Sequence, residues 1–117
     1  MANTFFSNTG IDDALAGIAA AGTFISLHTA SPGVTGANEV TGGSYARVAT
    51  TWGGASGSAD AGSQVTLNVP ASTTITHFGI WTLGSGGQYL GGGALPNSEA
   101  YTGAGTYLLT PTLAGSG

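Results

Sequence analysis

The sequence predicts a mainly β protein: a single antiparallel β-sandwich-like or barrel-like domain with one short N-terminal helix and an extended N-terminal arm. Apolar and polar residues alternate with a period of two in several segments after Gly22. Gly-, Ser-, Asn- and Pro-rich clusters separate these segments at the spacing of antiparallel sandwiches and barrels. One earlier segment has the 3.6-residue period of a helix instead. The 117 residues suit one domain with a modest core, over residues 9–117.

The N-terminal region divides into an arm and a helix. Met1–Asn8 is predicted to be extended, because Phe5 and Phe6 have no apolar partners at helical spacing. A helix is predicted over residues 11–21, since two aspartates in its first turn favour the positive end of the helix dipole and Gly22 is a natural stop. Its apolar stripe consists of Ile11, Leu15 and Ile18.

The remaining elements are strands. They are predicted over residues 23–29, 45–52, 64–69, 74–83, 88–95 and 105–113. Within the fifth of these, Gly91-Gly92-Gly93 indicates either a bulge or a close backbone approach, and the sequence does not choose between them.

The charge content excludes several functions. The chain has one Arg, no Lys and five acidic residues, so it cannot neutralise a row of nucleic-acid or lipid phosphates. Its surface must be built largely from Ser, Thr, Asn, Gly and Ala, which indicates that neighbours cover part of it. Glycines and Pro32 interrupt the uncharged stretch 14–38, and no basic residue precedes it, so neither a membrane span nor a secretory signal is predicted.

We expect no enzymatic activity, no catalytic residue, no metal and no cofactor. Ser, His and Asp occur without a nucleophile elbow, and the pair Asp12-Asp13 is better placed to cap a helix than to cleave a glycoside. His28 and His77 can meet across a sheet and bind a metal together with a carboxylate. The alternative, in which both histidines are hydrogen-bonded on a half-buried strand face, is favoured.

Arg47 is the most informative single residue. An unpaired guanidinium is costly when even partly buried, and Glu39 is the nearest acid in sequence. We predict that the two form a charge-assisted pair that clamps the loop Ala30–Ser44 onto the following strand, with Asn38 and Tyr45 as further members of this loop clamp. A solvated Arg47 is the alternative.

The aromatic residues suggest contacts with other molecules. Phe5, Phe6, Trp52 and Trp81 are candidate interface or arm anchors. The alternative is a sugar-binding platform of tryptophans and tyrosines, namely Trp52, Trp81, Tyr45, Tyr89, Tyr101 and Tyr107.

Two sequence blocks resemble the small tailed-bacteriophage proteins usually labelled tail-fibre proteins. The first is LHTASPGVTGANEV at Leu27–Val40, followed by GGSYAR at Gly42–Arg47. The second is ITHFGIW at Ile75–Trp81, followed by GGQYL at Gly86–Leu90 and GAL at Gly93–Leu95. The resemblance implies a β-rich virion structural protein without a cofactor.

Within that family, the absence of a collagen-like or heptad stalk favours a capsid decoration protein over a fibre. Such a protein would be made in the host cytoplasm and would bind the outer surface of the head, as a homotrimer in contact with the major capsid protein or other virion proteins. The alternative is a tail-fibre or tail-tip protein that binds a host surface glycan.

Overall fold

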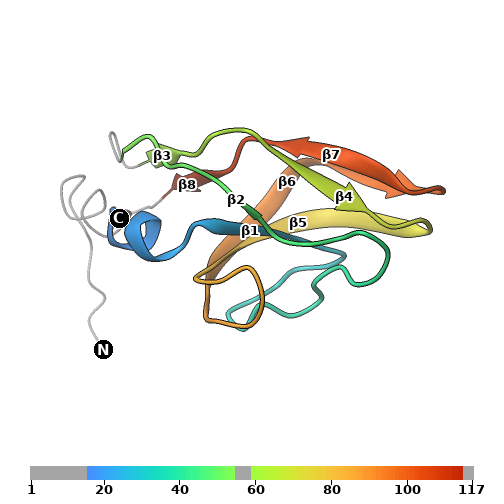
Figure 1. Ribbon diagram of the computed structural model, residues 1–117, viewed down its shortest axis with the longest axis horizontal. Coiled ribbons are helices and arrows are strands. Elements are labelled where there is room, and N and C mark those ends of the chain that lie inside the picture. Colours follow the sequence, from blue (N-terminus) through green and yellow to red (C-terminus); the bar gives the residue numbers. More distant parts are fainter. Residues whose placement is uncertain (1–15, 55–58, 115–117) are drawn as a thin grey trace, which may run out of the picture.

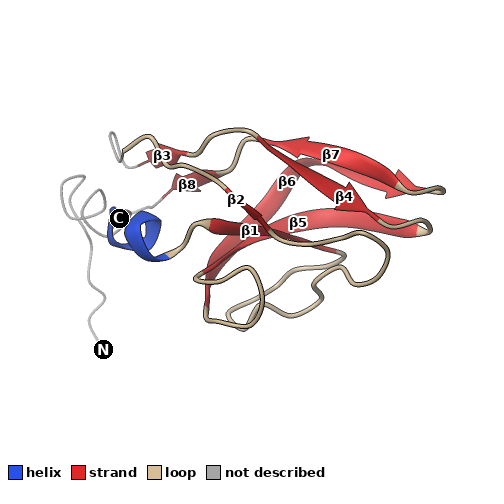
Figure 2. Cartoon of the chain, in the orientation of Figure 1, coloured by secondary structure: helices blue, strands red, loops and turns tan. Residues whose placement is uncertain are grey.

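Eight strands and one short helix make up the part of the chain that the computed structural model describes, residues 16–54 and 59–114 (Figure 2). Residues 16–21 are helical. The strands are β1 (Phe24–His28), β2 (Val48–Ala49), β3 (Ala59–Ala61), β4 (Val65–Val69), β5 (Thr73–Trp81), β6 (Tyr89–Tyr101), β7 (Gly105–Leu109) and β8 (Thr112–Ala114). The predicted arm 1–8 and the first part of the predicted helix, 11–15, lie outside the described residues.

The main sheet has four antiparallel strands in the order β2-β1-β5-β6. Ile25 is opposite Ile80 and Leu27 is opposite Phe78, so these side chains share the face that builds the core. The alternate positions share the other face; they include Ser26, His28, His77, Gly79 and Trp81.

Two shorter strand pairs, β4–β7 and β3–β8, complete the fold. In Figure 1 the β4–β7 pair lies against β5 and β6, to which short turns connect it. Val65, Leu67 and Val69 of β4 are buried while the residues between them are exposed, which is the alternation of a strand with one face on the core. The predicted mainly β, antiparallel fold with one short N-terminal helix is confirmed.

The strand predicted over 45–52 is wrong in its extent. Only Val48–Ala49 pairs with β1, and Trp52 forms an isolated bridge with Gly62. The chain crosses here from the main sheet to the β3 side: the N–H of Thr50 donates to Thr23, whereas Thr51 accepts from Ser63. A segment that changes partners within a few residues cannot form one long strand.

Three further predictions need correction. The strand predicted over 88–95 continues to Tyr101, because pairing with β5 resumes at Glu99 after an irregularity in which residues 95–98, including Pro96, lie opposite Thr76. The strand predicted over 105–113 is two strands, because the chain leaves β4 and joins β3 at Pro111. β3 was not predicted, as three residues without apolar alternation carry no strand signal.

The glycine run in β6 follows a bulge and also includes a close backbone approach, the two features between which the sequence did not choose. The register shifts between Ile80 and Trp81, which leaves Leu90 bulged between Tyr89 and Gly91. A Cβ at Gly92 would collide with the carbonyl oxygen of Phe78. This position therefore requires glycine.

Candidate functional site

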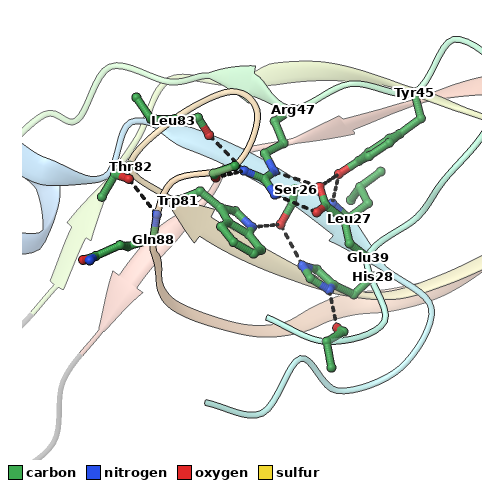
Figure 3. Close-up of polar contacts among 12 residues, drawn as sticks. Ser26, Leu27, His28, Glu39, Tyr45, Arg47, Trp81, Thr82, Leu83 and Gln88 are labelled. Carbon is green, nitrogen blue, oxygen red and sulfur yellow. Dashed lines mark hydrogen bonds and ion pairs between the residues drawn. The ribbon is translucent and has the colours of Figure 1, made fainter. Parts of the chain in front are cut away.

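A polar cluster lies on the face of the main sheet that points away from the core (Figure 3). Two loops cover this face, at residues 29–47 and 82–88. We use the name polar cluster for Ser26, His28, Glu39, Tyr45, Arg47 and Trp81.

The expected ion pair between Glu39 and Arg47 is present, and it is bidentate. Arg47 Nε donates to Glu39 Oε2 (2.9 Å) and Nη2 donates to Oε1 (2.8 Å). The side chains are only 9% and 20% exposed for Arg47 and Glu39 respectively, so Arg47 is not a solvated surface cation. Two parallel charge-assisted bonds fix both the distance and the orientation of the pair.

Arg47 also contacts the loop 82–88, which the sequence did not predict. Its Nη1 donates to the carbonyl oxygens of Leu83 (3.0 Å) and Gly86 (2.8 Å). The guanidinium carbon lies 3.6 Å from the centre of the Trp81 ring, in a cation–π contact. One side chain therefore connects the loop 29–47, the end of β5 and the loop 82–88.

Tyr45 links the ion pair to β1. Its hydroxyl donates to Glu39 Oε2 (2.7 Å) and accepts from the N–H of Leu27 (3.1 Å). Burial and the adjacent carboxylate raise the pKa of Tyr45. Burial alone would raise the pKa of Glu39, but the hydrogen bonds from Arg47 and Tyr45 outweigh it and leave that pKa lowered.

Asn38, the fourth residue of the predicted loop clamp, acts elsewhere in the loop. It has the left-handed backbone conformation (φ 65°), which asparagine tolerates better than most residues. Its Nδ2 donates to the carbonyl oxygen of Ser31 (3.0 Å). Asn38 thus closes the loop on itself rather than contacting the ion pair.

A chain of hydrogen bonds runs through the buried part of the polar cluster. Trp81 Nε1 donates to Ser26 Oγ (2.8 Å), and Ser26 Oγ lies 2.7 Å from His28 Nε2. His28 Nδ1 lies 2.7 Å from the carbonyl oxygen of Ala37, which can only accept, so Nδ1 carries the proton and Ser26 donates to Nε2. Burial lowers the pKa of His28, consistent with this neutral tautomer.

The Ser26–His28 pair lies within hydrogen-bond distance but is closed to any substrate. Both side chains are 0% exposed, and each polar atom already has a partner within the chain. His77 is opposite His28 in the register and its Nδ1 lies 2.7 Å from Thr76 Oγ1. Among the described residues there is no group of three side chains that could hold a metal ion.

The aromatic residues do not form one platform. Trp81 packs edge-on against Tyr89 in the polar cluster, with 5.3 Å between ring centres. Trp52 packs against the core and donates to the carbonyl oxygen of Gly22 (2.8 Å). Tyr101 and Tyr107 also pack against the core. Phe5 and Phe6 lie outside the described residues, and the role of any of these aromatics at an interface stays a prediction.

Sequence reasoning missed Trp81 as a partner of Arg47, and Ser26 as the residue that links Trp81 to His28. A signal was present: Ser26 and His28 are polar residues on the same face of an otherwise apolar strand, so they required polar partners there. The structure adds that Gly36 packs on Trp81, where a Cβ would lie 2.6 Å from the ring, and this contact has no signal in the sequence.

The fold and the polar cluster define a β-rich structural module in which polar side chains hold two surface loops in place. A family model described as Podophage GP4 fiber I protein gp80 matches residues 2–111, and the chain belongs to this family. It is therefore a virion structural protein of the phage-fibre type. A comparison with curated proteins gives no match. No helix among the described residues has the length and apolar character needed to span a bilayer.

Proposed function

We propose that the chain is a non-enzymatic component of a bacteriophage fibre, exposed on the particle surface after synthesis in the host cytoplasm. The family match over residues 2–111 carries this proposal, because the family is named for a fibre protein. That name favours a fibre over the capsid decoration role expected from the sequence.

The chemistry of the polar cluster supports a role through contact rather than catalysis. The single cation of the chain is engaged by Glu39 and two carbonyl groups. Ser26 and His28 are inaccessible. Fixed loops reduce the ordering entropy lost on binding, so they suit a protein that works by docking.

The proposed partners are further copies of the chain and other virion proteins. A homotrimer is one closed assembly that fits this role. Binding of a host surface glycan is a separate question, which a glycan array with purified particles would answer once the location on the particle is known.

The test is the number and position of copies in purified virions. Quantitative mass spectrometry against the major capsid protein, together with immunogold labelling, gives both. We expect far fewer copies than capsid subunits and label at discrete fibre positions. A ratio near one with label over the whole head would overturn the fibre assignment and favour capsid decoration.

A further inference from the structure

An exposed apolar side chain stands at the tip of a tightly held loop. Val34 is 94% exposed, the highest value among the large apolar side chains described. The N–H of Gly36 donates to the carbonyl oxygen of Pro32 (3.0 Å), and His28 donates to the carbonyl oxygen of Ala37 (2.7 Å). The loop thus presents Val34 in a preorganised position, and we name this tip the Val34 knob.

An uncharged groove of about 380 Å³ lies at the edge of the core, between β6, β8 and the helix. Its apolar lining includes Ile18, Phe78, Ile80, Leu90 and Leu113. It exists because Gly91 and Gly93, which are opposite Ile80 and Phe78 in the register, have no side chains to fill it. We name this site the β6 groove.

The walls of the β6 groove include strands with unpaired edges. Among the described strands, β6 pairs only with β5, and β8 pairs only with β3. An unpaired strand edge presents backbone N–H and C=O groups to an incoming chain. An uncharged loop therefore finds both apolar surface and backbone hydrogen-bonding groups at this site.

The Val34 knob and the β6 groove lie on opposite faces of the main sheet. The knob's loop packs through Gly36 on Trp81, on the face of the polar cluster. The groove is lined by Ile80, the residue before Trp81, and the side chain of Ile80 points to the core face. A contact between knob and groove of two copies is therefore heterologous, and each copy keeps one free knob or groove for the next.

We propose that the Val34 knob of one copy docks into the β6 groove of a second copy, which joins subunits head to tail. A second copy fits as the occupant because both surfaces lack charge and because the fibre role proposed above, on which this inference rests, requires repeated subunits. Head-to-tail contacts close into a ring, such as a trimer, or extend into a filament.

Sedimentation equilibrium of the full chain over a range of concentrations tests the proposal. We expect the wild-type chain to self-associate, and Val34→Asp or Gly91→Glu to weaken association at least tenfold. A Cβ at Gly91 meets no atom within 4 Å, so a side chain at this position starts in open space and extends into the groove. If Gly91→Glu fails to fold, the self-association of the Gly91→Ser and Val34→Asp variants is measured instead. Matched controls are Leu108→Asp, at an apolar side chain 59% exposed on β7, and Gly103→Glu, also in open space.

Mixing the two variants distinguishes this contact from any other. The Val34→Asp chain keeps an intact groove and the Gly91→Glu chain keeps an intact knob, so the mixture should form one-to-one heterodimers and nothing larger. A monomeric wild-type chain at millimolar concentration, equal effects of the controls, or no heterodimer in the mixture would overturn the proposal. These measurements do not depend on where the protein sits in the particle, so they fail separately from the fibre assignment.

Discussion

Replacement of Arg47 by Met removes the charge and the donors of the guanidinium while keeping most of its aliphatic stem. Glu39 would then hold a mostly buried carboxylate with Tyr45 as its remaining side-chain donor. Breaking a buried ion pair by removing one partner costs about 3–5 kcal/mol. The carbonyl groups of Leu83 and Gly86 are in an exposed loop and recover hydrogen bonds to water, so they add little. We therefore expect a loss of about 3 kcal/mol in the free energy of unfolding.

Urea denaturation at pH 7, followed by tryptophan fluorescence, measures this loss, and Glu39→Gln with the double variant completes a double-mutant cycle. The double variant should be more stable than the sum of the two single losses implies, by at least ~1 kcal/mol, since it leaves no unpaired charge. A loss below about 0.5 kcal/mol for Arg47→Met, the range of solvated surface pairs, would refute the reasoning.

The pH dependence of the free energy of unfolding is a second measure of what the Glu39–Arg47 pair contributes. Because the pKa of Glu39 is lowered from its ordinary value of 4.5, the unfolded chain binds more protons as the pH falls below that value. The stability that the pair contributes is therefore present above pH 4.5 and lost as the pH falls through the folded pKa. Arg47→Met should lose much of this acid-dependent part.

Three other substitutions, with Gly91→Ala as a control, test the packing of the polar cluster. Gly79→Ala places a Cβ 2.6 Å from Ser26 Oγ and should cost about 1–3 kcal/mol by urea denaturation, whereas Gly91→Ala, in open space, should be neutral or slightly stabilising; equal effects would contradict the close packing at Gly79. Tyr45→Phe leaves the buried N–H of Leu27 without an acceptor and should cost about 1–3 kcal/mol, and a neutral result would mean that water replaces the hydroxyl. Burial lowers the pKa of His28 below 6.5, so the unfolded chain binds this proton more readily than the folded chain does. The free energy of unfolding should therefore be highest above pH 6.5 and fall as the pH drops through the folded pKa of His28. His28→Gln should abolish that part of the pH profile, and an unchanged profile would assign it to another group.

The sequence predicts best where one local pattern determines the structure. β1 and β4 are predicted to within two residues, because their apolar alternation matches a strand with one face on the core. The same reasoning fails where partners change along the chain. At Pro111 the apolar pattern continues from β7 into β8 while the backbone exchanges β4 for β3. The neighbours of a strand depend on the whole fold, and the local apolar alternation carries no information about them.

In the candidate site, too, the sequence predicts one pairing but not the contacts between distant segments. Charge balance was enough to pair Arg47 with Glu39, since a chain with one cation has few ways to bury it. It did not reveal that the guanidinium lies on Trp81 or reaches the loop 82–88, because those contacts join residues more than thirty positions apart in the sequence. Similarly, the metal-binding alternative, which the sequence did not favour, needed a third ligand, and the register that places His28 opposite His77 brings no carboxylate into a three-ligand group with them among the described residues.

The position of Arg47 also constrains how this protein binds its neighbours. The guanidinium has five N–H donors in a fixed plane, so one residue can hold both Glu39 and the loop 82–88, which is distant in the sequence. Arg47 is the only Arg or Lys of the chain, and its burial in this pair leaves no second Arg or Lys to attract an acidic partner. In the proposed self-association, contacts between copies would then rest on shape, apolar surface and backbone hydrogen bonds, which salt screens far less than it screens pairs of exposed charges. Self-association should accordingly withstand high ionic strength, whereas substitutions that put a charge into an apolar contact should weaken it.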